Sequence, residues 1–285
     1  MEKILVPTDF TPIAELGLKL ASEIASRSGA IISLVNFTKH PFGRTFSATA
    51  DTTLQSEPEE SRFMLELLRV NKAKLEDLAA KYTREGVEIE YTIVDDELAD
   101  GIDDYLEKEY IDLVVMGTSG EESAQEVFTG NHTEQVIQVS SCPVLSVRDG
   151  FHLQDFENIV LAVNMIKDEE VLKGLNTLRQ FAEAFNSHIH MVHVRDNATD
   201  STVDLNIFFK RMAESAGLQH YSITILEKTD AAEAVIDFAR EVRAGIIAVI
   251  KNSKEGIFRI FSNHFSDRLV KEVGRPVFTY NLLNN

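Results

Sequence analysis

The sequence predicts an α/β protein of two tandem doubly wound domains, each a five-stranded, mainly parallel sheet with helices on both faces. Short apolar runs alternate with longer segments whose apolar residues recur at helical spacing, which is typical of such sheets. The pattern restarts near Asp149, where residues 158–164 (NIVLAVN) echo residues 3–9 (KILVPTD). A chain of 285 residues suits two ordinary domains, which we place at residues 1–148 and 151–285.

The first half is expected to open with a strand at residues 3–6 and a helix at residues 11–28. Thr11 is a suitable N-cap, Pro12 suits the first turn, and Gly29 suits the end of the helix. Further strands are expected at residues 30–37, 87–94, 111–116 and 142–147, and further helices at residues 59–85, 98–109 and 133–140. Residues 39–58 show no periodicity and are predicted to form a long loop.

The second half repeats this order. Its strands are expected at residues 158–164, 187–194, 219–226, 245–250 and 275–280, and its helices at residues 171–186, 201–217, 231–243 and 266–274. The run at residues 245–250 (GIIAVI) is aligned with residues 111–116 (IDLVVM), and residues 275–280 (RPVFTY) with residues 141–147. We therefore interpret the chain as an internal duplication.

The order of the strands predicts where a ligand would bind. If the strands at residues 3–6 and 111–116 lie side by side, their carboxyl ends flank the point where the winding of the sheet reverses. Asp9 follows the first of these strands and Gly117 follows the other. Ligands of doubly wound sheets bind at this point, so we expect a site there.

Composition limits the function. The net charge of −18 argues against nucleic acid as a partner, because phosphate backbones are bound by Lys and Arg. No apolar run is long enough to span a membrane and the first residues lack a signal-peptide layout, so we expect a cytoplasmic protein without a membrane partner. The single cysteine, Cys142, allows no internal disulfide and is expected to be a buried structural thiol.

A glycine-punctuated segment, residues 117–133 (GTSGEESAQEVFTGNHT), joins a predicted strand to a predicted helix. Gly117 and Gly120 would allow a close backbone approach, and Asn131 with Glu134 approximates a capping box. The free amides at such a helix start suit a phosphate. The segment matches neither a P-loop nor the dinucleotide fingerprint, and by itself it is also compatible with a simple turn.

Taken together, these motifs resemble the universal stress protein family, in a tandem form that covers nearly the whole chain. The resemblance rests on residues 4–10 (ILVPTDF), residues 112–117 (DLVVMG), the G-x2-G-x9-G spacing and residues 142–145 (CPVL). It implies a Rossmann-like fold of the adenine nucleotide alpha hydrolase-like kind. It also implies a stress-response protein that binds ATP or AMP in its N-terminal domain, with Mg as an optional companion.

The resemblance also implies the site. In ATP-binding members the Asp after the first strand and the backbone near the second strand hold adenosine, while the glycine loop and the next helix start hold the phosphates. Carried over to this sequence, the nucleotide-binding residues are Pro7, Thr8, Asp9, Phe37, Met116, Gly117, Gly120, Gly130, Asn131, His132 and Thr133.

The sequence departs from the family pattern in both halves. In the first half Asn131 stands where the family has Ser or Thr. Glu121, Glu122 and Glu126 could repel a triphosphate or help to hold magnesium, but more often such a run is only a solvated loop. In the second half Asn164 stands where Asp9 stands, and residues 251–254 (KNSK) are aligned with the GTSG region. We therefore expect one nucleotide per chain and a degenerate second domain.

Other residues carry weaker suggestions. Lys251 and Lys254 could bind an anion but more often such lysines only face solvent. His188, His190 and His193 resemble a metal cluster, but on a strand His193 would point away from the other two, so no metal site is predicted.

Three functions remain open at this stage. The first is a non-enzymatic nucleotide-binding regulatory module, the second an interaction scaffold that binds no nucleotide, and the third a slow ATPase. No catalytic residues are predicted, because no general base, arginine finger or Ser-His pair is evident. Beyond the nucleotide we expect an unknown protein partner and an intramolecular pseudo-dimer through residues 143–147 and 276–280, with a further homodimer as an option.

Overall fold

A computed structural model describes residues 1–39, 58–118, 132–165, 169–195, 201–228, 230–251 and 275–282. The N-terminal half contains β1 (Lys3–Pro7), α1 (Pro12–Ser28), β2 (Ile31–Phe37), α2 (Pro58–Tyr82), β3 (Glu88–Val94), α3 (Leu98–Glu109), β4 (Leu113–Gly117), α4 (His132–Val139) and β5 (Val144–Val147). The C-terminal half contains a 3-10 helix η2 (Leu153–Glu157), β6 (Asn158–Ala162), α5 (Val171–Phe185), β7 (His188–Arg195), α6 (Thr202–Ser215), β8 (Tyr221–Glu227), α7 (Ala231–Glu241), β9 (Ile246–Lys251) and β10 (Val277–Asn281). The helix expected at residues 266–274 lies outside the described residues.

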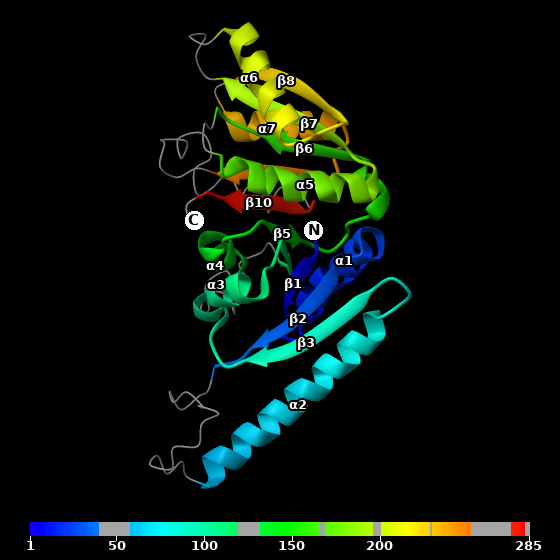
Figure 1. The fold of residues 1–285 in the computed structure, drawn as a ribbon, viewed down its shortest axis with the longest axis vertical. Helices are drawn as coiled ribbons and strands as arrows, with labels where there is room; N and C mark the ends of the chain where they lie inside the picture. The colour runs from blue at the N-terminus through cyan, green and yellow to red at the C-terminus, as the bar shows by residue number, and fades with distance from the viewer. Residues whose placement is uncertain are drawn as a thin grey trace.

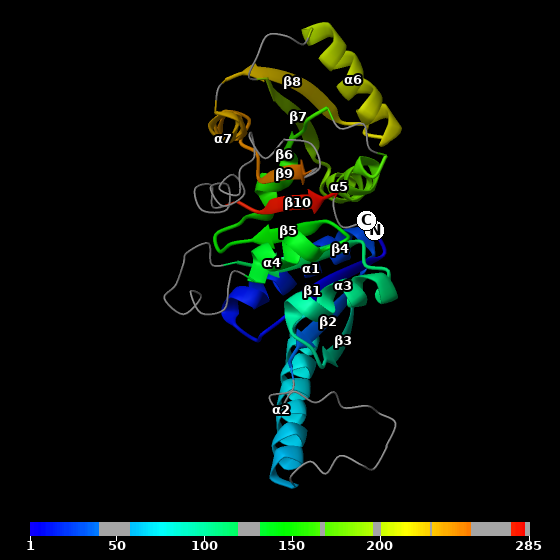
Figure 2. The ribbon, with the colours of Figure 1, turned by 90° about the vertical axis from the view of Figure 1, so that its left-hand side faces the viewer.

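All ten strands belong to one sheet, in the order β3-β2-β1-β4-β5-β10-β9-β6-β7-β8 (Figures 1 and 2). Within each half the strands are parallel, as predicted. The halves meet where β5 and β10 pair antiparallel, with Phe278 opposite Leu145. The expected pairing of the two last strands is therefore present, and neither strand is left as an open edge.

Helices cover both faces of the sheet. On one face α1, α2, α5 and α6 pack into an apolar cluster that runs through both halves. The other face is covered by α3 and α4 in the N-terminal half and by α7 in the C-terminal half. Residues of β1 alternate between these layers, with Ile4 and Val6 in the first and Leu5 in the second. The predicted doubly wound α/β fold is confirmed.

The first helix begins and ends where the sequence indicates. The Thr11 side chain accepts a hydrogen bond from the Ala14 amide, and Pro12 follows it in the first turn. Gly29 adopts a left-handed conformation, with φ of 74°, and its amide donates to Ala25.

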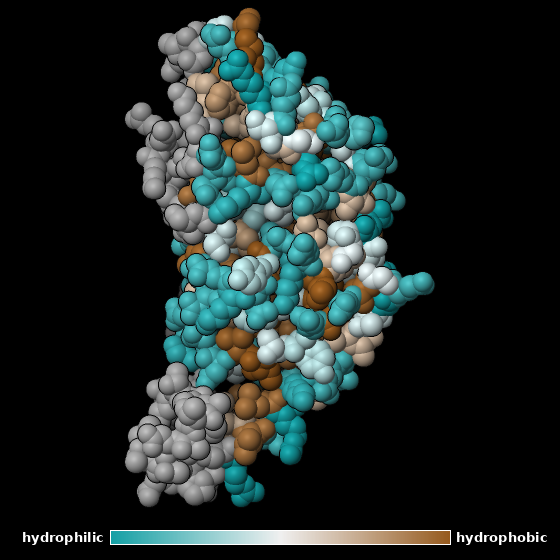
Figure 3. Space-filling model, in the orientation of Figure 1, coloured by the Kyte–Doolittle hydropathy of each residue, from teal (hydrophilic) through white to brown (hydrophobic). Residues whose placement is uncertain are grey.

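The helix α2 extends past the edge strand β3 (Figure 1). Its first turns expose Phe63, Leu65, Leu68 and Val70, so apolar side chains gather along this end of the molecule (Figure 3). We refer to these four residues as the α2 patch.

Two glycines bring α1 close to β4. A Cβ atom at Gly117 would overlap the carbonyl oxygen of Ile13 in α1, and a Cβ at Gly17 would lie 2.9 Å from the Gly117 amide nitrogen. Glycine at these positions is therefore required by the packing of helix on strand.

We predict that Gly117→Ala lowers the free energy of unfolding by about 1–3 kcal/mol, because the first turn of α1 must move away from β4. Urea unfolding measures the change. The conservative variant Val115→Ile on the same strand gives the cost of an added methylene without a new contact to the main chain of α1. If Gly117→Ala is as stable as the wild type, the first turn of α1 can move away from β4 without a cost in free energy.

Candidate functional site

The carboxyl ends of β1, β2 and β4 form one edge of the sheet. β1 lies between β2 and β4, so the winding reverses between β1 and β4, as the sequence predicted. β4 and β5 are parallel, so α4, which connects them, must start near this same edge. We call the space beyond these strand ends the N-terminal crevice.

Most of the predicted site residues lie around this crevice. Pro7 ends β1, and the buried Thr8 and exposed Asp9 follow it. Phe37 ends β2, Met116 and Gly117 end β4, and His132 and the buried Thr133 begin α4. Gly120, Gly130 and Asn131 lie outside the described residues.

Only one of the two carboxylate oxygens of Asp9 is held by hydrogen bonds from described residues. Its Oδ1 accepts hydrogen bonds from the amide of Thr11 at 3.0 Å and from its hydroxyl at 2.6 Å. Its Oδ2 has no partner in the part of the chain that the structure describes. The carboxylate can therefore accept a donor from a ligand without losing its own support.

The end of β2 leaves main-chain groups facing the crevice. The Val35 carbonyl accepts from Thr8 on the β1 side, and the Thr38 amide donates to Val94 on the β3 side. Main-chain groups alternate in direction along a strand, so the amide and carbonyl of Phe37 face the β1 side, where β1 has already ended. The Phe37 ring instead packs edge-on against Tyr105, with ring centroids 6.0 Å apart.

A buried hydrogen-bond network, which the sequence analysis did not predict, ties these strand ends to α2. Asn36 Nδ2 donates to the Thr8 carbonyl at 2.7 Å, and Asn36 Oδ1 accepts from Thr38 Oγ1 at 2.5 Å and from Asn71 Nδ2 at 2.9 Å. A polar residue on the apolar face of a helix, between Met64 and Leu75, was the sequence feature that could have indicated it.

Phe10, beside Asp9, has a left-handed backbone with φ of 67°. Such a conformation is uncommon for an aromatic residue and is found preferentially at functional sites. Lys74 of α2 places its Nζ 5.0 Å from the centre of the Phe10 ring, which brings a cation to the rim of the crevice.

The C-terminal half differs at each equivalent position. The strand registers place Ile250, not Lys251, at the position of Gly117, so the predicted alignment of residues 251–254 with the glycine loop was wrong by one residue. The same registers place Tyr280 at the position of Val147. Both Ile250 and Tyr280 are buried side chains, and they fill space beside α5.

His193 replaces Asn36 in this half. Its Nδ1 lies 3.0 Å from the Val163 carbonyl, which only accepts, so Nδ1 carries the proton. Its ring packs on Phe209 of α6, with centroids 5.1 Å apart, where the N-terminal half has Asn71 of α2. Within the described ranges, the amide network is therefore confined to the N-terminal half.

The other two histidines form a neutral hydrogen-bonded pair on the opposite face of β7. Their rings are 4.6 Å apart, and Ser222 Oγ lies 3.1 Å from His188 Nε2 and from His190 Nδ1. His190 Nε2 lies 3.0 Å from Asn158 Oδ1, so both nitrogens of His190 are occupied. No group of three ligands able to hold a metal occurs among the described residues.

Cys142 is buried, and burial raises the pKa of its thiol to about 12. Ser140 Oγ lies 3.7 Å from its Sγ. The thiol is protonated at neutral pH and unsuited to nucleophilic chemistry, as a structural cysteine should be.

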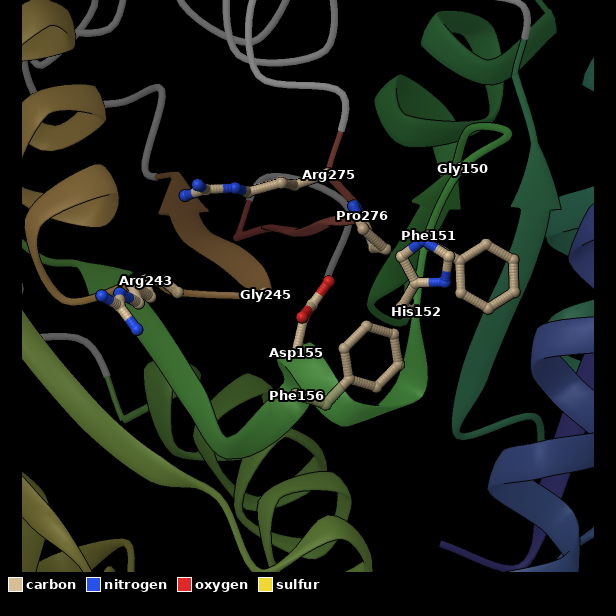
Figure 4. Close-up of a pocket in the computed structure, with 10 residues that line it drawn as sticks. Gly150, Phe151, His152, Asp155, Phe156, Arg243, Gly245, Arg275 and Pro276 are labelled. Carbon is tan, nitrogen blue, oxygen red and sulfur yellow. The ribbon is translucent and has the colours of Figure 1, made fainter.

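A cavity of about 300 Å³ lies at the amino ends of β6, β9 and β10, on another edge from the strand ends that bind ligands in such sheets (Figure 4). Arg275 extends along its wall toward α7, where its Nη1 donates to the Ala239 carbonyl at 3.0 Å. This guanidinium supports the C-terminal end of α7, so the cavity is not assigned a ligand.

Three comparisons with known proteins bear on this geometry. The sequence model of the Universal stress protein family matches residues 1–148. The chain is 27% identical to universal stress protein MJ0577 of Methanocaldococcus jannaschii over 153 residues, which are 52% of this chain and 94% of that protein. It is 26% identical to universal stress protein YxiE of Bacillus subtilis over 148 residues, which are 51% of this chain and 98% of that protein.

Several solved structures resemble the whole chain. A universal stress protein from Archaeoglobus fulgidus superposes with a TM-score of 0.66, at 17% identity, and covers 98% of this chain and 96% of its own. At this identity the likeness concerns the fold, which is Rossmann-like. No helix among the described residues is long and apolar enough to cross a bilayer.

The histidine pair generates a prediction about pH. Burial lowers the pKa of both imidazoles, and His220 beside His188, and His188 beside His190, lower these pKa values further. The other described groups against His190 are Asn158, Ser222 and the ring of Phe238, none of which carries a charge. The unfolded chain therefore takes up protons first as pH falls through about 6.5.

We predict that the free energy of unfolding falls between about pH 7 and pH 5, and that His190→Gln reduces this fall because one depressed histidine is removed. Urea unfolding at several pH values measures the effect. The exposed His152→Gln serves as the control for losing an imidazole. The same pH dependence in His190→Gln and wild type would contradict the prediction.

Proposed function

Because the chain belongs to the universal stress protein family, we propose that residues 1–148 form a domain that binds an adenine nucleotide, ATP or AMP. The protein then acts in the stress response as a non-enzymatic regulatory module. One observation carries this proposal. A free carboxylate oxygen of Asp9 and the outward-facing amide and carbonyl of Phe37 lie at the same crevice.

These groups suit adenosine. Adenine presents an N–H donor next to a ring-nitrogen acceptor, which matches one main-chain carbonyl and one main-chain amide. The ribose hydroxyls can donate to Asp9 Oδ2. Pro7, Thr8 and Met116 then line the crevice between the base and the sheet.

The phosphates are assigned to the start of α4. His132 and Thr133 are the first residues of this helix, whose leading amides suit an anion. The net charge of −18 opposes a triphosphate, and a magnesium ion bound with the nucleotide would offset this field. Gly120, Gly130 and Asn131 complete the proposed site.

The C-terminal half is proposed to be a second domain, residues 151–285, that binds no nucleotide. Ile250 and Tyr280 occupy the positions of Gly117 and Val147, and Asn164 lacks the charge of Asp9. Its role is then to complete an intramolecular pseudo-dimer through the pairing of β5 with β10.

A second candidate function is an interaction scaffold. The α2 patch favours it, since exposed apolar residues gathered on one helix are typical of protein contacts. A slow ATPase is less well supported, since no described side chain at the crevice is arranged as a general base for water.

Native mass spectrometry of protein purified without added nucleotide tests the proposal. A retained mass of ATP, ADP or AMP would support nucleotide binding, and conversion of bound ATP to ADP would support the ATPase. If calorimetry with ATP and magnesium detects no binding, the interaction scaffold remains as the candidate function.

We predict that Asp9→Ala weakens adenine nucleotide binding by on the order of 1.5–3 kcal/mol, or roughly 10- to 150-fold, because a hydrogen bond to a charged acceptor is lost. Asp9→Asn keeps an acceptor for Thr11 and separates the loss of charge from loosening of the turn before α1. Calorimetry gives the affinities. Unchanged affinity in both folded variants would remove Asp9 from the site.

We also predict a stoichiometry of one nucleotide per chain. The matched variant Asn164→Asp restores the carboxylate in the C-terminal half but should leave the stoichiometry at one, because the Ile250 side chain remains. Titration with ATP and magnesium measures both proteins. A value near two in the wild type would show that the second half retains a site.

A further inference from the structure

Asn71 is a buried amide on the apolar face of α2, between Met64 and Leu75. A buried amide in such a position weakens a core unless its hydrogen bonds are made. Its Nδ2 donates to Asn36 Oδ1 at 2.9 Å and lies 3.3 Å from Thr38 Oγ1. Both partners belong to the end of β2, so Asn71 is directed at the segment that borders the crevice.

The network leaves Asn36 no freedom. Its Nδ2 is used by the Thr8 carbonyl and its Oδ1 by Thr38 and Asn71, so the amide cannot flip without losing all three bonds. Thr8 at the end of β1 and Thr38 at the end of β2 are thereby fixed relative to each other. Such a fully satisfied buried network selects one arrangement of the groups around it.

Phe37 lies between Asn36 and Thr38, the two residues that the network holds. Its amide and carbonyl are the groups that face the crevice beyond the end of β1. The orientation of these two main-chain groups therefore depends on hydrogen bonds made by its neighbours, and through them on Asn71.

The two halves of the chain provide a natural comparison. At the equivalent positions the C-terminal half has His193, which bonds the Val163 carbonyl, and Phe209, which packs on it. The strand ends are still bridged there, but among the residues that the structure describes no amide from the helix reaches them. The hydrogen bond that joins the two strand ends thus suffices for folding. The Asn71 bond therefore has another role in the N-terminal half.

We propose that Asn71 is a positioning residue that sets base specificity at the N-terminal crevice. Acting through Asn36, it holds the Phe37 amide and carbonyl in the donor and acceptor order that accepts adenine. Hypoxanthine reverses this order, because its ring nitrogen donates and its exocyclic oxygen accepts. The inference rests on the proposed function, since it assumes that a nucleoside occupies this crevice.

The first experiment compares affinities for adenosine, inosine and AMP in the wild type, in Asn71→Leu and in Thr38→Val. Thr38→Val removes a hydroxyl from the same network without altering α2, so it serves if Asn71→Leu fails to fold. The control is Asn206→Leu, a helix asparagine whose side chain bonds the Thr202 carbonyl of its own helix.

We expect the preference for adenosine over inosine to fall at least fivefold in both network variants, and the ratio of AMP to adenosine affinity to stay unchanged. A general loss of structure would not change the ratio of adenosine to inosine affinity while leaving the ratio of AMP to adenosine affinity unchanged. An unchanged adenosine preference in folded Asn71→Leu and Thr38→Val would overturn the proposal.

A second measurement does not depend on a ligand. Hydrogen exchange at the amides of Asn36 and Thr38 should become at least tenfold faster in the network variants, while residues 32–34 of β2 remain slow. If the wild type binds no nucleoside, the proposed function fails and so does the assignment of base specificity, whereas unchanged exchange at Asn36 and Thr38 overturns the positioning role by itself.

Discussion

The antiparallel pairing of β5 with β10 is the constraint on which the molecule depends. Each of these strands would otherwise be an unpaired edge, and together they turn two five-stranded sheets into one. Because strands of the two halves point in opposite directions at this junction, their carboxyl ends open on opposite edges. The two halves could therefore diverge at these edges without interfering with each other, and they differ in sequence there, with Gly117 in one half and Ile250 at the equivalent position of the other.

Local patterns in the sequence were enough to predict the fold. The alternation of Ile4, Leu5 and Val6 between two faces follows from apolar periodicity, and the limits of α1 follow from Thr11, Pro12 and Gly29. The error in aligning the halves has a simple cause. Two continuous apolar runs can be shifted by one residue without changing their pattern, and only the pairing of Ile159 with Ile246 settles the register.

The candidate site was predictable only in part. Asp9 was expected at the strand ends because it follows a strand whose place in the sheet could be inferred, whereas Phe37 was named only because the family resemblance implied it. The Asn36–Asn71 bond joins residues 35 positions apart. It depends on how α2 lies across the sheet, which no local pattern specifies. Gly117 has a second role that no local pattern indicated, because the absence of a Cβ leaves room for the Ile13 carbonyl of α1.

The burial of Cys142 has a consequence for how the protein reacts with oxidants. Its thiol is the chain's single cysteine, it is shielded from solvent, and its proton is held by a pKa of about 12. Thiolates, and not protonated thiols, attack peroxides and disulfides, so oxidants leave this residue untouched while β4 and β5 stay closed. An oxidant that acts on the folded protein must therefore act at a group other than this thiol, and alkylation of Cys142 would instead report the opening of the sheet.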